Sequence, residues 1–92
     1  MLKIIRLGDS VIRMGTPEEF VAAVSKQLVA ERNASGLSLN ELAEKAGISR
    51  STLHLFEKGK RTPDMRQVSL IADALDLSTM EFLRRAEDRV SK

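Results

Sequence analysis

The chain has 92 residues, of which 42% are hydrophobic, with a formal net charge of +2 and no cysteine. This length suits one small domain with one core. A sequence without cysteine has no disulfide, no thiol nucleophile and no cysteine-ligated metal. With one histidine and no converging group of carboxylates, we expect no metal and no cofactor. No apolar run approaches the roughly 20 residues of a membrane span, and the first residues are too short an apolar run for a signal sequence. We therefore expect a cytoplasmic protein with no membrane partner.

Positive charge is concentrated in the middle of the sequence. Residues 45–66 contain six Lys and Arg residues and two acidic ones, whereas residues 17–44 and 67–83 are each net negative. A local basic patch is what a phosphate backbone attracts. Solvated charged loops show the same pattern. The patch therefore indicates nucleic-acid binding only if a DNA-binding motif accompanies it in the sequence.

The first fifteen residues predict a two-stranded hairpin. Residues 2–7 and 11–14 are rich in β-branched residues, and the turn-like Gly8-Asp9-Ser10 separates them. Because a lone hairpin is marginally stable in water, we expect it to pack on the rest of the chain or to pair with a second subunit. The alternative is a partly ordered N-terminal arm.

Five helix starts follow, and they predict an all-α bundle. Thr16, Ser38, Asp64 and Ser78 each have the form of a capping box, in which two residues three positions apart cap each other, and Ser49 is a weaker cap. Apolar residues recur every three or four positions after each start, which is typical of helices packed on one side. We expect the core to contain Phe20, Val24, Leu28, Leu42, Ala43, Ala46, Leu53, Phe56, Val68, Ile71, Ala72, Leu75, Phe82, Leu83, Ala86 and Val90.

Residues 38–57 are the most informative segment. They contain two capped helices with very little sequence between them. Gly47 falls where the turn demands a positive φ, which glycine adopts without steric cost. Ala43 is small where the two helices would cross. Such a unit holds its second helix at the surface, where its exposed face can enter a major groove.

From about residue 28 to residue 77 the sequence resembles the Cro and phage-repressor class of helix-turn-helix domains, also called the xenobiotic-response-element (XRE) family. The resemblance rests on Arg32, Gly36-Leu37-Ser38, Glu41-Leu42-Ala43, Gly47-Ile48-Ser49, Glu57-Lys58-Gly59-Lys60, Pro63 and Ile71-Ala72-Asp73-Ala74-Leu75. Each fragment is short, but their order and spacing together are specific. The resemblance implies a five-helix, lambda-repressor-like DNA-binding bundle, which we place at residues 16–92, after the hairpin or arm expected at residues 1–15.

The resemblance also implies which residues contact DNA. The second helix of the motif, from Ser49 to about Lys58, would lie in the major groove. Arg50 is our candidate for reading a base, because a guanidinium bonds guanine in a bidentate way; the alternative is a phosphate contact. The other expected contacts are Asn40 in the first helix of the motif, Ser49, Ser51, Thr52, His54 and Leu55 on the second, and Lys58, Lys60 and Arg61 on the loop that follows.

Two positions depart from the family pattern, and one pair follows it. Leu39 stands where the family usually has a glutamine that bonds a phosphate, so Asn40 and the helix-end amides would take over that contact. Leu55 occupies a position that is commonly polar, and it would touch a thymine methyl or turn toward the core. Arg32 and Glu57 resemble an ion pair that sets the angle of the recognition helix.

We therefore predict a sequence-specific transcription regulator, a repressor that binds a two-fold DNA operator as a homodimer, because one recognition helix reads only a few base pairs. The dimer surface would be Met80, Leu83 and Val90, or else the edge of the hairpin. The alternative is an antitoxin that binds a toxin protein and regulates its own gene. Without a glycine-rich phosphate loop or a nucleophile–base pair, we expect no catalytic residues and no enzyme activity.

Overall fold

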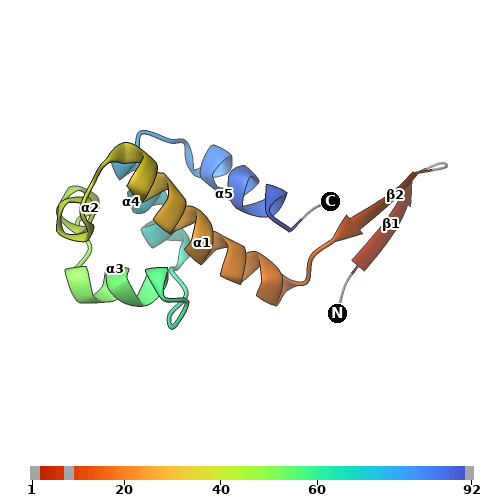
Figure 1. The fold of residues 1–92 in the computed structure, drawn as a ribbon, viewed down its shortest axis with the longest axis horizontal. Helices are drawn as coiled ribbons and strands as arrows, with labels where there is room; N and C mark the ends of the chain where they lie inside the picture. Colours follow the sequence, from red (N-terminus) through yellow and green to blue (C-terminus); the bar gives the residue numbers. More distant parts are fainter. Residues whose placement is uncertain (1–2, 8–9, 91–92) are drawn as a thin grey trace.

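The computed structural model describes residues 3–7 and 10–90, with side-chain environments from residue 15 onward. Its elements are β1 (Lys3–Leu7), β2 (Ser10–Met14), α1 (Pro17–Ser35), α2 (Leu39–Ala46), α3 (Arg50–Glu57), α4 (Met65–Ala74) and α5 (Thr79–Asp88). The helices form one bundle, and the two strands extend from one end of it (Figure 1). The prediction of a five-helix, all-α bundle is confirmed. None of these helices is long and apolar enough to cross a membrane.

Local side-chain caps fix where the helices begin. Thr16, Ser38 and Asp64 close complete capping boxes at the starts of α1, α2 and α4. At the start of α5, Ser78 accepts a hydrogen bond from the Glu81 N–H, but the predicted box is only half formed. The Glu81 carboxylate is instead held by two arginines of its own helix, so it does not return to the cap.

The turn between α2 and α3 is short because Gly47 adopts a left-handed conformation. Its φ of 70° ends α2, as its place in the sequence predicts. The Ile48 N–H donates to the Ala43 carbonyl at 3.0 Å, which closes the turn. Ser49 then caps α3, whose first residue follows directly. Two helices are thus joined at a sharp angle by only three residues.

The apolar faces of the five helices meet in one core. Leu42 and Leu53, which come from the two helices of the motif, are fully enclosed there. Phe20, Leu83 and Val90 were expected inside but are half-buried at the edge of the cluster. The buried cluster consists of Ala23, Val24, Leu28, Leu42, Ala43, Ala46, Leu53, Phe56, Val68, Ile71, Ala72, Ala74, Leu75, Phe82 and Ala86.

Polar side chains attach α5 along α1. Arg85 donates to Glu31 at 2.7 Å, and Arg89 donates to Gln27 at 2.6 Å. Gln27 also donates to Glu31 at 2.6 Å, so the two contacts share one network. Because α1 is the longest helix, this network holds the last helix against the element that spans the bundle.

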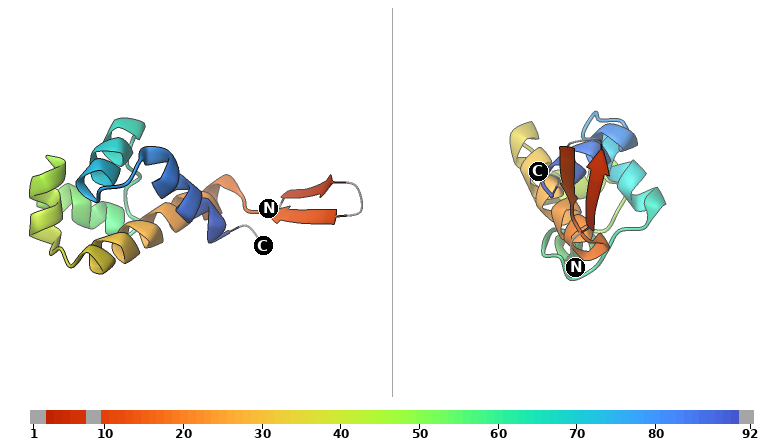
Figure 2. Two further views of the ribbon diagram at one scale, coloured as in Figure 1. Left: turned by 90° about the horizontal axis from the view of Figure 1, so that it is seen from above. Right: turned by 90° about the vertical axis from the view of Figure 1, so that its right-hand side faces the viewer.

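The predicted hairpin is present and lies beyond the helices. Strands β1 and β2 pair in antiparallel register, with Ile5 opposite Ile12. Ser10, which we placed in the turn, begins β2, whereas residues 2, 8 and 9 of the prediction lie outside the described residues. The hairpin extends the molecule along its longest dimension of 48 Å instead of lying on the helices (Figure 2). Of the two expected placements, packing of the hairpin on the bundle is therefore wrong, and pairing with a second subunit stays a prediction.

The charge network of α5 predicts a loss of stability in acid. Hydrogen bonds from Arg84 and then Arg85 lower the pKa of Glu81 from 4.5 to about 2. A carboxyl whose pKa is lower in the folded state stabilises the fold above its unfolded pKa, and this contribution disappears as the pH falls from about 4.5 to about 2. Urea unfolding at pH 6 and pH 3 should show a larger loss of stability for the natural chain than for Glu81→Gln. Equal losses in the two proteins would contradict this assignment.

Candidate DNA-binding surface

Helices α2 and α3 share one buried side, which leaves the opposite side of α3 in solvent. Leu42, Ala43 and Ala46 of α2 and Leu53 and Phe56 of α3 are buried. Of the α3 residues expected to meet DNA, Ser49, Arg50, Ser51 and His54 are exposed, and Thr52 and Leu55 are half-buried. Four of the six predicted positions are therefore exposed, on the side of α3 away from the buried Leu53 and Phe56.

The start of α3 is rigid, and it presents Arg50. The Ser49 hydroxyl accepts from the Thr52 N–H at 3.2 Å and donates to the Thr52 hydroxyl at 2.8 Å. These two hydroxyls hold the first turn of the helix. Within the described part of the chain, Arg50 and His54 form no ion pair or side-chain hydrogen bond, so their donors face solvent. Arg50 is the cation of α3 that is available to an external acceptor.

A basic loop folds back against the carboxyl end of α3. Gly59, with a φ of 71°, lets the chain reverse after Lys58. The Lys60 and Arg61 N–H groups then donate to the Leu55 carbonyl at 3.0 and 3.3 Å. Lys58, Lys60 and Arg61 are all exposed. The Leu55 carbonyl was missed by sequence reasoning, although the glycine within Glu57-Lys58-Gly59-Lys60 signals such a reversal.

The two family departures have different structural outcomes. Leu39 is half-buried and packs against the core, so it serves the interior of the bundle. Asn40, the next residue, is exposed in the first turn of α2, beside the capping box in which the Glu41 N–H donates to Ser38. Leu55 is half-buried, and its carbonyl organises the basic loop, a role that neither of its two predicted placements included.

Arg32 and Glu57 meet in a bidentate ion pair. The Arg32 Nε lies 2.6 Å from one Glu57 oxygen, and Nη2 lies 2.9 Å from the other. Arg32 Nη1 also donates to the Leu37 carbonyl at 3.1 Å. The side chains are only 18% and 9% exposed, and the hydrogen bonds to Glu57 raise the pKa of Arg32. One guanidinium therefore joins the end of α1, the segment before α2, and the last residue of α3.

Charged residues outside this surface pair with one another, as Arg85 does with Glu31 and Glu81. Among residues 3–7 and 10–90, no group of three or more histidine, aspartate or glutamate residues is arranged to hold a metal ion. The exposed cations after α3 and the face of α3 thus form the concentrated charged feature near the motif. A group of exposed cations beside a projecting helix can hold the phosphates of a DNA duplex and place the helix in its major groove.

Comparison with known proteins identifies the same region. Residues 28–82, more than half of the chain, match the family described as Helix-turn-helix, HTH_3. The restriction-modification controller protein C.AhdI from Aeromonas hydrophila is 31% identical over 67% of this chain and 94% of its own, with a TM-score of 0.65. None of the curated proteins compared with this chain matches it.

Two further solved structures have the same fold. The clp gene regulator ClgR from Corynebacterium glutamicum is 26% identical over 76% of this chain and 74% of its own, with a TM-score of 0.71. An HTH_3 family transcriptional regulator from Vibrio cholerae is 28% identical, with a TM-score of 0.71, over 80% of this chain and 42% of its own. The Cro-like and XRE resemblance deduced from the sequence is confirmed.

The Arg32–Glu57 geometry predicts a stability cost that exposed pairs do not share. Glu57→Ala leaves a guanidinium unpaired and mostly out of solvent, which should lower the free energy of unfolding by about 3 kcal/mol in urea titrations. Asp88→Ala removes an exposed partner of Arg84 and serves as the control, with a smaller expected loss. If both variants lose the same stability, the pair does not anchor α3.

Proposed function

This chain belongs to the helix-turn-helix family HTH_3 and is a DNA-binding transcription regulator, and from that premise we propose that it is a cytoplasmic repressor that binds a two-fold operator as a homodimer. The observation that carries the proposal is the exposed, unpaired Arg50 at the start of a helix whose far end is fixed by a bidentate ion pair. A cation on a rigid helix is suited to reading a base edge, since discrimination requires fixed geometry.

The contacts divide into a reading set and a positioning set. Arg50, supported by His54 and Ser51, would face the base edges in the major groove. Lys58, Lys60 and Arg61 would hold phosphates beside the carboxyl end of α3, and Asn40 would hold one at the start of α2. Ser49 and Thr52 would act mainly through each other, because their hydroxyls are already engaged at the cap.

Repression is the simplest form of regulation for such a chain, because it requires only that the protein occupy an operator. C.AhdI is described as a controller protein and ClgR as a gene regulator, which agrees with a regulatory role. The antitoxin alternative receives no support from these relatives, none of which is described as binding a toxin. Two copies are proposed because α3 has eight residues and can span only a few base pairs, whereas two half-sites provide specificity.

The proposal is tested by selecting bound sites from a random DNA pool with the natural chain and then with Arg50→Ala. We expect a two-fold consensus for the natural chain. Arg50→Ala should lose discrimination at one symmetric pair of positions, by about 1–3 kcal/mol per contact. The absence of any consensus at moderate salt would refute operator reading, and a consensus of one half-site would refute the dimer. If Arg50→Ala weakens binding to all DNA sequences equally, Arg50 contacts a phosphate and does not read a base.

The basic loop predicts a different signature for Lys60. Lys60→Ala should weaken binding to all DNA sequences alike and reduce the slope of log affinity against log salt by about 1, because one fewer counterion is released. The measurement is fluorescence anisotropy on specific and random duplexes across a salt series. Arg84→Ala makes the same charge change on α5, where Arg84 forms two exposed ion pairs within its own helix, and should leave the slope unchanged. Equal slopes for Lys60→Ala and the natural chain would show that Lys60 does not contact the DNA phosphates.

A further inference from the structure

A polar hollow lies between the basic loop and the first half of α1. It has a volume of about 330 Å³. Lys58, Gly59 and Arg61 line it from the loop, and Ser25 and Lys26 line it from α1. Two of the cations that we assign to DNA phosphates, Lys58 and Arg61, therefore share one hollow with two residues of α1.

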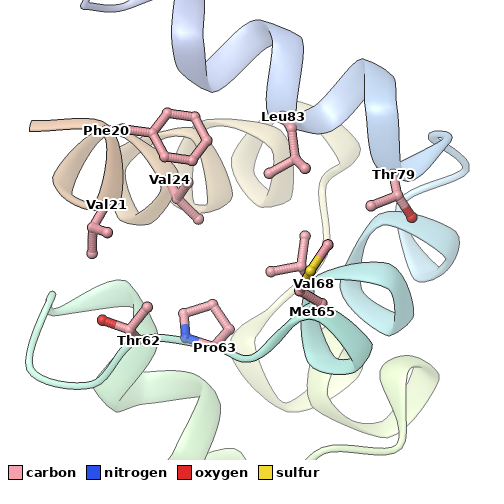
Figure 3. Close-up of a pocket in the computed structure, with 9 residues that line it drawn as sticks. All are labelled: Phe20, Val21, Val24, Thr62, Pro63, Met65, Val68, Thr79 and Leu83. Carbon is pink, nitrogen blue, oxygen red and sulfur yellow. The ribbon is translucent and has the colours of Figure 1, made fainter. Parts of the chain in front are cut away.

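The loop is held against α1 on both sides of this hollow. Thr62 and Pro63, which follow the loop, line an apolar groove together with Val21 of α1 (Figure 3). Val21 also lines the polar hollow, so the two depressions adjoin on α1. Before the loop, the bidentate pair of Glu57 with Arg32 ties the end of α3 to the same helix. The hollow is therefore a feature of packed elements.

Ser25 contributes a buried hydroxyl to the hollow. The residue is only 8% exposed, and within the described part of the chain its hydroxyl makes no hydrogen bond. Every fully enclosed side-chain oxygen in that part has a partner, so the Ser25 oxygen must reach the open space that it lines. A Cβ on Gly59 would lie 3.9 Å from it, which places the loop backbone beside the hydroxyl. Such a hydroxyl is available to an external acceptor.

Lys26 is the cation of α1 that the fold leaves without a partner. It is exposed and forms no ion pair among the residues that the structure describes. Two carboxylates that line hollows beside it are already engaged. Glu57 accepts two hydrogen bonds from Arg32, and Glu19 accepts one from the Thr16 N–H. The ammonium group is therefore free to meet an anion from outside the chain.

The balance of charge at the hollow favours an anion. Lys26, Lys58 and Arg61 are exposed, and none of them is paired in the described part of the chain. The charge of Glu57 is offset by its own ion pair. Glu18 also lines the hollow, but it is exposed and lies eight residues before Lys26, about 12 Å along the helix axis. Lysine, arginine and serine side chains are the donors that proteins use to hold DNA phosphates.

We propose that this hollow binds a phosphate of the DNA backbone, with Lys26 and Ser25 as contacts outside the helix-turn-helix. The inference rests on the proposed DNA contacts of Lys58 and Arg61 and extends them onto α1. The Ser25 hydroxyl donates to a phosphate oxygen, and the Lys26 ammonium offsets its charge. The loop follows the carboxyl end of α3, remote from Arg50, so this phosphate flanks the bases that α3 reads. The contact adds affinity without sequence information.

Salt dependence on random duplexes tests the two residues, and it does not require an operator. Lys26→Ala should weaken binding about three- to tenfold and lower the slope of log affinity against log salt by about 1 per bound chain. Ser25→Ala removes an uncharged donor, so it should weaken binding about two- to fivefold and leave the slope unchanged. Arg84→Ala removes a cation that is already paired on α5 and should change neither quantity.

Two results would overturn the site. An unchanged slope for Lys26→Ala means that Lys26 contacts no phosphate. Weaker binding by Lys26→Ala together with natural binding by Ser25→Ala places the phosphate outside the hollow. Urea unfolding checks that both variants fold, and we expect natural stability. Lys26 is exposed, and Ser25→Ala loses only a hydroxyl that has no partner in the described part of the chain.

Ethylation of single phosphates on a selected operator locates the contact. One ethylated phosphate per half-site should weaken binding of the natural chain and have less effect on Lys26→Ala, whereas identical patterns would contradict the proposal. Inorganic phosphate provides the comparison with a free anion. If it shifts the amide resonances of Ser25 and Lys26 while Lys26→Ala keeps its DNA affinity, the hollow serves a free anion and the proposal is wrong.

Failure of this inference is distinguishable from failure of the proposed function. A natural chain that selects a two-fold operator, with no change of slope in Lys26→Ala, refutes the phosphate site alone. A natural chain that selects no operator refutes the proposed function, and the slope on random DNA still decides whether Lys26 meets a phosphate.

Discussion

The bidentate contact between Arg32 and Glu57 is the interaction on which the arrangement of the surface depends. Helix α3 is only eight residues long, and two of its residues, Leu53 and Phe56, are buried. Its apolar side fixes the depth at which it sits, and the ion pair fixes its last residue relative to α1. The third bond, to the Leu37 carbonyl, ties the entry of α2 to the same guanidinium.

This anchoring has a geometric effect at the opposite end of the helix. Eight residues span about 12 Å at the rise of an α-helix, so a rotation of about ten degrees at Glu57 displaces Arg50 by about 2 Å. That displacement exceeds the range over which a hydrogen bond keeps its strength. Under the proposed function, the buried pair would serve recognition through position alone, while the exposed cations after α3 would supply an attraction to phosphates that tolerates such displacement.

Features that depend on near neighbours could be predicted from the sequence, and features that depend on tertiary contacts could not. Thr16 caps its helix by bonding a residue three positions away, and Gly47 adopts a backbone conformation that other residues avoid. Both features can therefore be recognised in the sequence. Leu39 packs at the edge of the core only because of the way α2 is oriented against the other helices. Glu81 bonds two arginines of its own helix instead of the N–H group at its cap. Phe20 lies at the edge of the core, and helical periodicity does not distinguish this position from the interior. The angle of α3 could not be predicted, because it depends on the Arg32–Glu57 ion pair, which only the structure shows.

The short connections and self-contained caps also govern how quickly the bundle forms. Each helix is started by residues within one turn of it, and consecutive helices are separated by only a few residues, so little loop-closure entropy opposes their meeting. Chains dominated by such local contacts fold on the order of microseconds to milliseconds. Encounters between molecules at cellular concentrations are slower. Folding is therefore expected to precede association, and under the proposed function each chain would meet DNA with helix α3 already in place.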